Sequence, residues 1–244
     1  MKKENILYSI IGLLLGFIVG FTFANTTNRQ GYAAPGVTSG QQPANLPPNH
    51  PAIENSGPSA EAIEAAAKLA AEQPDNFDAQ ARAAEQLYAA HRYPEAIKLF
   101  ERANQLRPEE FDVILGLGNA NFDAERFEDA GRWYGAALKR QPDNVNVRTD
   151  LGLTFFFREP RDIERAVKEF RASLERDPAH VPTLQNLTIA LNAAGDREGA
   201  RATLAKLEKV SPQNAALPRL RAELEKTDAA VQTPAKTSTE KGGD

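Results

Sequence analysis

The side chains that could carry chemistry are few and lie far apart in this sequence. Its three histidines are His50, His91 and His180, and none stands in a metal-ligand spacing such as His-Glu-x-x-His. Cysteine is absent, so a thiol nucleophile and a disulfide are both excluded. There is no Gly-x-Ser-x-Gly elbow, and the acidic residues are spread along the chain. We therefore expect no catalytic activity, no metal and no cofactor.

One pair of glycines resembles part of a phosphate-binding loop. Gly116-Leu117-Gly118, followed by Asn121, falls short of a dinucleotide fingerprint. The pair also lies within a predicted helix that no strand precedes, whereas the fingerprint requires a strand before it. Close packing between helices explains these glycines better than a ligand does.

The composition is that of a protein that is soluble and globular for most of its length. Of its 244 residues, 41% are hydrophobic and 25% are charged, and the net charge is −4. Lys and Arg form no dense stripe, and both signs of charge are mixed along the chain. A nucleic acid is therefore not expected among its partners.

The elements that could position a site follow a period of about 34 residues. Prolines stand at Pro74, Pro108, Pro142, Pro178 and Pro212, so the intervals are 34, 34, 36 and 34 residues. A fixed period in this range indicates stacked helical hairpins. Each proline ends the second helix of a hairpin, because it cannot donate the backbone bond and forces the residue before it out of the helical region.

Small and large side chains keep register with these prolines. Leu117-Gly118 and Leu151-Gly152 occupy matching places in the first half of their units. In the second half, alanines stand twelve residues before the closing proline and larger side chains one helical turn later: Ala96, Ala130, Ala166 and Ala200, then Phe100, Tyr134, Phe170 and Leu204. This pattern resembles the tetratricopeptide repeat over about residues 77 to 214, and the unit at 111–144 matches best.

The resemblance implies an all-α protein, an α-solenoid of tetratricopeptide-type hairpins within residues 59–227. We expect a half repeat at 59–76 with Ser59 as its N-cap, repeats at 77–110, 111–144, 145–180 and 181–214, and a capping helix at 215–227. The third unit is two residues longer, and the excess fits the loop at Arg158 to Arg161, because Glu159-Pro160 breaks a helix. Residues 228–244 are expected to be a disordered tail.

In this family the first helices of the units line a concave surface that binds other proteins or peptide segments. The positions that the resemblance assigns to this groove are Asp78, Ala81, Glu85, Tyr88, Asp112, Leu115, Asn119, Phe122, Asn146, Thr149, Leu153, Phe156, Phe157, Gln185 and Ile189. The rings of Tyr88, Phe122 and Phe156 recur every 34 residues, and they either pack between helices or contact a ligand. Adjacent helical residues point about 100° apart, so we predict that Phe156 packs and Phe157 meets the partner.

One ligand class of the family is excluded. The branch that grips the C-terminal carboxylates of cytosolic chaperones needs Lys, Asn, Asn, Lys and Arg at five groove positions. Here those positions hold Ala81, Glu85, Gly116, Asn146 and Asp150. None matches, and the two acidic side chains would repel a carboxylate.

An uncharged stretch near the N-terminus predicts a membrane anchor within residues 1–24. Residues 6–24 carry no charge and would span roughly 28 Å as a helix, close to the thickness of a hydrocarbon core. Lys2 and Lys3 precede the stretch and only Arg29 closely follows it, so the positive-inside rule places the N-terminus in the cytoplasm. A signal peptide cleaved after Ala24 is the alternative.

Two further features belong to the N-terminal part of the chain. Gly12, Gly16 and Gly20 lie four apart on one face of the predicted span, which would let two spans pack closely. Residues 25–58 hold six prolines and four glycines without apolar periodicity, which predicts a disordered linker.

Together these features favour a single-pass membrane protein whose repeats bind protein partners outside the cytoplasm, as a scaffold or assembly factor. Such a topology resembles bacterial envelope proteins, with the anchor in the inner membrane and the repeats in the periplasm. Two alternatives stay open: a structural organiser that self-associates into a homo-oligomer through the glycine stripe, and an import-receptor-like protein with cytosolic repeats.

Overall fold

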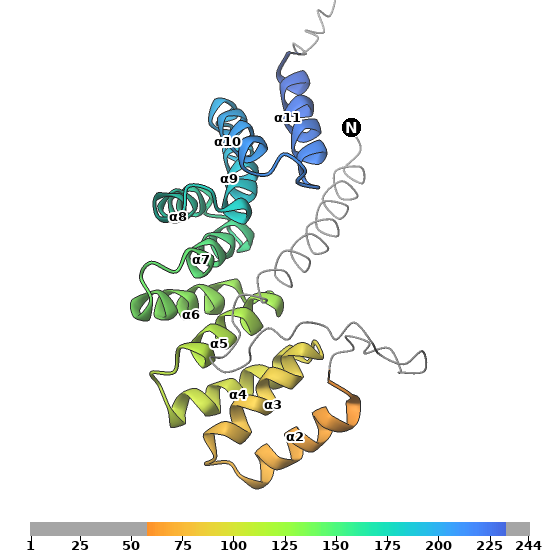
Figure 1. Ribbon diagram of the computed structural model, residues 1–244, viewed down its shortest axis with the longest axis vertical. Coiled ribbons are helices and arrows are strands. Elements are labelled where there is room, and N and C mark those ends of the chain that lie inside the picture. Colours follow the sequence, from red (N-terminus) through yellow and green to blue (C-terminus); the bar gives the residue numbers. More distant parts are fainter. Residues whose placement is uncertain (1–57, 233–244) are drawn as a thin grey trace, which may run out of the picture. The chain divides into compact units, whose positions relative to one another are not determined.

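The computed structural model describes residues 58–232, and in this range the chain folds into helices joined by short loops (Figure 1). The helices in chain order are α2 Ala60–Glu72, α3 Phe77–Ala89, α4 Tyr93–Leu106, α5 Phe111–Asp123, α6 Phe127–Arg140, α7 Val145–Phe157, α8 Ile163–Arg176, α9 Val181–Ala193, α10 Arg197–Val210 and α11 Leu217–Gln232. The predicted all-α solenoid is confirmed for this part of the chain.

Consecutive helices pair into four hairpins that stack in sequence order. We call α3, α5, α7 and α9 the A helices and α4, α6, α8 and α10 the B helices. Each A helix packs on its own B helix, and α5, α7 and α9 also pack on the B helix of the preceding unit. Helix α3 packs on α2 instead, and α3 touches α5 as α7 touches α9. The A helices begin at Phe77, Phe111, Val145 and Val181, which are the first residues of the four predicted repeats.

Polar side chains begin several of these helices. Ser59 accepts a hydrogen bond from the backbone nitrogen of Ala62, as predicted for the N-cap of α2. Asn76 and Asn144 cap α3 and α7 in the same way. Glu110 stands at the N-cap of α5 but makes no side-chain cap bond.

Close crossings within the hairpins explain the glycines of the motif. A Cβ atom at Gly118 would lie 2.6 Å from the ring of Tyr134, and one at Gly152 would lie 2.5 Å from the ring of Phe170. Both rings are almost completely buried. The glycine therefore makes room for the aromatic residue of its own B helix, which is a packing role and not that of a phosphate loop.

The two extra residues of the third unit lie where the sequence predicts them. Five residues separate α7 from α8, whereas three separate the helices of the other hairpins. The peptide bond between Glu159 and Pro160 is cis, and Asp162 ends the loop by capping α8.

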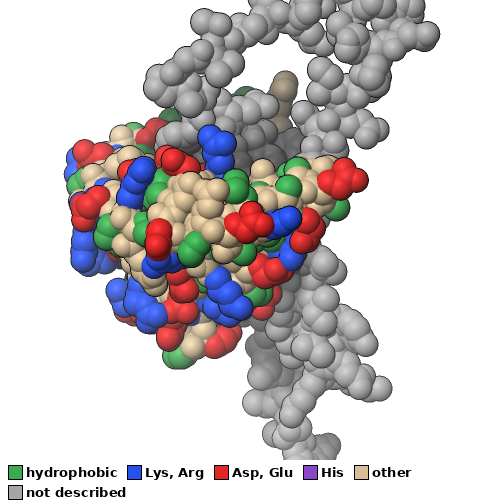
Figure 2. Space-filling model, turned by 90° about the horizontal axis from the view of Figure 1, so that it is seen from below, with side chains coloured by type: hydrophobic (Ala, Val, Ile, Leu, Met, Phe, Trp, Pro, Cys, Tyr) green, Lys and Arg blue, Asp and Glu red, His purple; other side chains and the backbone are tan. Residues whose placement is uncertain are grey.

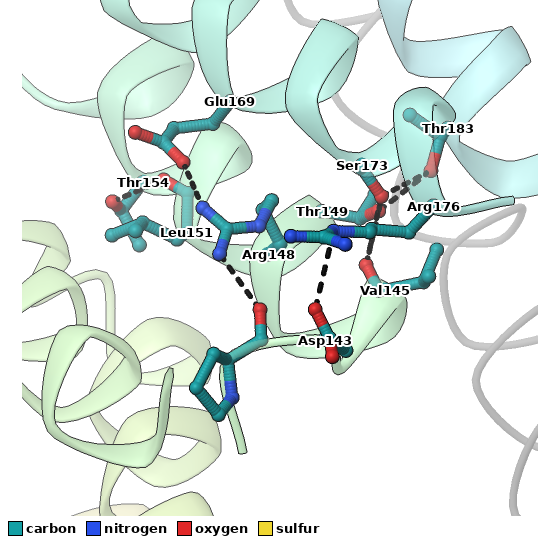
Figure 3. Close-up of polar contacts among 11 residues, drawn as sticks. Asp143, Val145, Arg148, Thr149, Leu151, Thr154, Glu169, Ser173, Arg176 and Thr183 are labelled. Carbon is teal, nitrogen blue, oxygen red and sulfur yellow. Dashed lines mark hydrogen bonds and ion pairs between the residues drawn. The ribbon is translucent and has the colours of Figure 1, made fainter. Parts of the chain in front are cut away.

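A cluster of buried hydroxyl groups joins the third and fourth units (Figure 3). The Thr149 hydroxyl lies 3.0 Å from that of Ser173 and 2.6 Å from that of Thr183. Thr149 and Ser173 also donate to the carbonyl oxygen of Val145 at 2.8 and 3.0 Å. His180 completes the cluster, with Nδ1 2.6 Å from the Thr183 hydroxyl. Directional bonds of this kind fix how α7, α8 and α9 fit together.

The C-terminal helix is longer than predicted. Helix α11 continues to Gln232, five residues beyond the expected end of the capping helix at residue 227. The next proline is Pro234, and a residue before proline is disfavoured in a helix, so the chain has no strong stop signal earlier. The start of the predicted tail is therefore helical.

Several predictions concern residues outside the described range. They are the membrane span at 6–24, the glycine stripe at Gly12, Gly16 and Gly20, and almost all of the linker at 25–58. Among the helices of residues 58–232, none is both long enough and apolar enough to cross a membrane.

The A-helix face as a candidate partner site

The residues predicted to line the groove divide by burial. Four of them are buried, namely Phe122, Thr149, Leu153 and Phe156, with exposed fractions of 9%, 3%, 2% and 9%. Three are exposed, namely Asp78, Glu85 and Asp112, and the half-buried ones are Ala81, Tyr88, Leu115, Asn119, Asn146, Phe157, Gln185 and Ile189. We call the surface formed by the exposed and half-buried residues of the A helices the A-helix face.

Thr149 and Leu153 are not open to a partner in this structure. Thr149 is enclosed by its hydrogen bonds to Ser173 and Thr183, because α8 and α9 pack over it. Leu153 stands one turn further along the same helix and is buried as well. The groove positions of the family therefore carry over less well to the third unit, where these two side chains hold neighbouring helices together.

A cluster of four phenylalanine rings lies where α5, α6 and α7 meet. Phe157 stacks on Phe127 with ring centroids 5.8 Å apart and meets the edge of Phe122 at 6.0 Å. Phe156 is perpendicular to Phe157 at 5.4 Å. Phe156 is buried and Phe157 is half-buried, which is the expected order of burial, but Phe157 also packs against other rings. A role of Phe157 in partner binding stays a prediction.

Two tyrosines connect the polar part of the A-helix face. The Tyr88 hydroxyl donates to the carboxylate of Asp123 at 2.5 Å, across neighbouring A helices. The Tyr134 hydroxyl donates to the side-chain oxygen of Asn119 at 2.9 Å. Burial raises the pKa of Tyr134 well above its ordinary value, and the negative charges of Asp150 and Asp123 add to this effect. Tyr134 therefore acts as a neutral hydrogen-bond donor.

Carboxylates on consecutive A helices act on one another through their like charges. Loss of solvent and the charge of Asp123 raise the pKa of Asp150 to about 7. The pKa of Glu85 is also raised, first by loss of solvent and then by the charge of Asp112, against an opposing effect of Arg82. In both pairs the partners are 27 residues apart, so the same arrangement of charges recurs from one unit to the next.

The charges of the A helices are mostly negative. These helices contain five carboxylates, at Asp78, Glu85, Asp112, Asp123 and Asp150, and two cations, at Arg82 and Arg148. Each B helix carries both signs. On the face of the molecule shown in Figure 2, Lys and Arg side chains likewise lie intermingled with Asp and Glu.

Arg148 does not neutralise the carboxylates of the A-helix face. Its guanidinium binds the Glu169 carboxylate on α8 at 3.1 Å and donates to the backbone oxygen of Pro142 at 2.8 Å (Figure 3). Arg148 is thus held against the neighbouring B helix. Helices α5 and α9 contain no Lys or Arg, so the other positive side chain of the A helices is Arg82 on α3.

The prediction from sequence did not place Asp123 or Asp150 in the binding site. The sequence pattern assigns Asp150 only to the exclusion of one class of ligand, and it assigns no role to Asp123. The repeated separation of 27 residues between acidic side chains is a signal that could have identified them. This separation is one repeat of 34 residues minus about two helical turns. A residue late in one A helix therefore comes beside a residue early in the next A helix.

The histidines make local contacts in the part of the chain that the structure describes. His91 Nδ1 lies 2.6 Å from the hydroxyl of Tyr93. His180 is half-buried, and its burial lowers its pKa, against an opposing effect of Asp177. Within residues 58–226, no three His, Asp or Glu side chains come together in a way that could hold a metal ion.

Comparison with known proteins agrees with this architecture. A family model described as tetratricopeptide repeat matches residues 87–151 and 158–224, which is more than half of the chain. No curated protein matches it.

Three solved structures illustrate the likeness in fold. The crystal structure of MamA is 18% identical with a TM-score of 0.57, and the aligned region covers 62% of this chain and 88% of the MamA chain. MamA from Desulfovibrio magneticus RS-1 is 17% identical with a TM-score of 0.58, and the aligned region covers 64% of this chain and 86% of that chain. YrrB, described as a TPR protein with an unusual peptide-binding site, is 20% identical with a TM-score of 0.59 and covers 66% and 82%. At these identities the likeness concerns the fold alone. The match of the family model, together with the stacked hairpins, shows that the chain belongs to the tetratricopeptide repeat family.

Proposed function

We propose that this protein is a membrane-anchored scaffold of the bacterial cell envelope that binds a segment of another protein on its A-helix face. Proteins of the tetratricopeptide repeat family are protein-interaction modules. The observation that carries the proposal is the A-helix face, to which each of the four stacked units contributes exposed or half-buried side chains. Repeat proteins use extended surfaces of this kind to hold partners.

The chemistry of the face fits a peptide or protein segment better than a small molecule. Half-buried aromatic and aliphatic side chains, such as Leu115, Phe157 and Ile189, lie among carboxylates and amides. Apolar anchors surrounded by polar groups are typical of surfaces that recognise extended or helical segments. The peptide-binding site described for YrrB, which shares the fold, gives this proposal further support.

The anchored topology rests on the sequence. The uncharged run at 6–24 follows Lys2 and Lys3, which favours a cytoplasmic N-terminus and periplasmic repeats. The linker at 25–58 would separate the repeats from the bilayer by a root-mean-square distance of roughly 30 Å. A partner could then be held at some distance from the membrane.

Site-directed photocrosslinking in intact membranes tests the proposal. A photoreactive residue is placed at Asn146 on the A-helix face, and a matched one at the exposed Lys139 on the B helix α6. We expect a discrete adduct from position 146 that position 139 does not give. Equal adducts from both positions, or none from position 146, would contradict binding on the A-helix face.

A further inference from the structure

The proposed scaffold function leaves the chemistry of the partner open, and the like-charge pairs of the A-helix face bear on it. Among the described residues, Glu85, Asp112 and Asp150 make no hydrogen bond and no ion pair. Each of them is paired with a carboxylate on a neighbouring A helix whose charge acts within the pair, Glu85 with Asp112 and Asp150 with Asp123. Carboxylates that repel one another and lose solvent raise the free energy of the unbound protein, and a cation placed between them would lower it.

We propose that Glu85, Asp112, Asp123 and Asp150 recognise a basic segment of another protein, in which two Lys or Arg residues stand three or four positions apart in an extended chain. This inference rests on the proposed function, since it specifies the partner of the same face. The Glu85 and Asp112 pair receives one cation, and the Asp123 and Asp150 pair receives the other.

The spacing follows from the repeat geometry. Asp123 stands four residues further along its unit than Glu85, and Asp150 stands four further than Asp112, so the second pair is displaced by one helical turn. It is also displaced by one A helix. Neighbouring packed helices lie about 10 Å apart and one turn rises about 5.4 Å, which gives a separation of about 11 Å. An extended chain advances about 3.3 Å per residue, so the two cations stand three or four residues apart.

Other occupants fit these pairs less well. A second copy of the chain would bring one acidic A-helix face against another, which like charges oppose. In residues 1–57 the cations are Lys2, Lys3 and Arg29, and in 233–244 they are Lys236 and Lys241, so no two stand three or four positions apart. A metal ion is disfavoured because the face brings no three potential ligands together within residues 58–226.

Selection from a random dodecapeptide library with the full-length chain in detergent solution tests this inference. The charge-reversed variant is Glu85→Lys with Asp112→Lys, both at exposed positions. The matched control is Glu101→Lys with Glu128→Lys, which makes the same charge change at exposed positions of the B helices α4 and α6. A third variant, Asp150→Asn, removes one of the two charges of the other pair and leaves Asp123 in place.

We expect the unmodified chain to enrich peptides with two Lys or Arg residues at the stated spacing. Their affinity should fall at least tenfold in the charge-reversed variant, several-fold in Asp150→Asn, and less than twofold in the control. It should also fall between about 50 and 500 mM salt, because partly exposed charges are screened.

The outcomes separate this inference from the proposed function. Enriched peptides without a basic pair, or basic peptides that bind both double variants equally, would overturn the inference and leave peptide binding intact. Failure of the unmodified chain to enrich any peptide would overturn both. A concentration-dependent dimer that the charge-reversed variant abolishes would identify a second copy as the occupant and overturn the inference as well.

Discussion

Tyr88 on α3 donates a 2.5 Å hydrogen bond to Asp123 on α5, although 35 residues separate them along the chain. The bond joins the first helices of consecutive units at the acidic part of the A-helix face. Because the acceptor is a carboxylate, this bond is of the stronger, charge-assisted kind.

A double-mutant cycle measures what this bond contributes to stability. We expect Tyr88→Phe to lower the free energy of unfolding, whereas Asp123→Asn weakens the same bond and also relieves the repulsion of Asp150. The cycle separates these effects, and we expect a coupling energy of about 1 kcal/mol between the two positions. Urea unfolding of the four proteins gives the value. A coupling energy indistinguishable from zero would mean that the bond does not contribute to the stability of the stack.

The raised pKa of Asp150 makes stability depend on pH. Below about pH 4 the residue is protonated in both the folded and the unfolded chain and contributes nothing. Between about pH 4 and its folded pKa of about 7 the folded chain keeps the proton and the unfolded chain loses it, so stability falls as the pH rises. Above pH 7 the full penalty is present.

Asp150→Asn should remove this penalty. At pH 8 we expect the variant to be more stable than the unmodified chain by about 2 kcal/mol, since each pKa unit corresponds to about 1.4 kcal/mol and part of the residue is open to solvent. The difference should shrink as the pH is lowered to about 4. Melting curves at several pH values check this, and a difference that does not change with pH would be inconsistent with it.

The crossing of α5 and α6 predicts opposite effects for two identical substitutions. Gly118→Ala places a methyl group 2.6 Å from the Tyr134 ring, so it should lower the free energy of unfolding by roughly 1 to 3 kcal/mol. Gly135→Ala on α6 meets no atom within 4 Å and should raise it by about 0.5 to 1 kcal/mol through helix propensity. Thermal melts compare the two variants, and equal effects of the same sign would show that Gly118 is not at a close crossing.

The adjacent residues Phe156 and Phe157 of α7 should differ in their contributions to stability and to partner binding. Phe156 is buried, so Phe156→Ala should lower the free energy of unfolding by roughly 3 kcal/mol. Phe157 is half-buried, so Phe157→Ala should have a smaller effect on stability and should weaken capture of the protein partner. If both variants melt early and neither loses the partner selectively, the rings belong to the core alone.

The topology proposed for the N-terminal segment has a direct test. Protease added to spheroplasts should digest the repeats, because the charges of Lys2 and Lys3 favour a cytoplasmic N-terminus. Repeats that survive until the inner membrane is broken would show the reverse orientation. Repeats recovered in the soluble fraction would show that the segment is a cleaved signal peptide.

The sequence alone determined the architecture of the repeats. The spacing of the prolines predicts where each hairpin ends, and the observed A helices begin at Phe77, Phe111, Val145 and Val181. The extra residues of the third unit were placed correctly in the loop before α8. These features are local, because backbone geometry, capping and side-chain size act between residues that are close in the chain or repeat at a fixed period.

Only the tertiary structure decided which side chains of the A helices face a partner. Thr149 occupies a groove position by its place in the repeat, yet it is buried because Ser173 and Thr183 from two other helices bind its hydroxyl. Asp123 and Asp150 look like ordinary surface carboxylates in the sequence, and stacking of consecutive units brings their charges together. Burial and like-charge repulsion depend on residues that meet only when neighbouring units pack, so no property of a single helix could predict them.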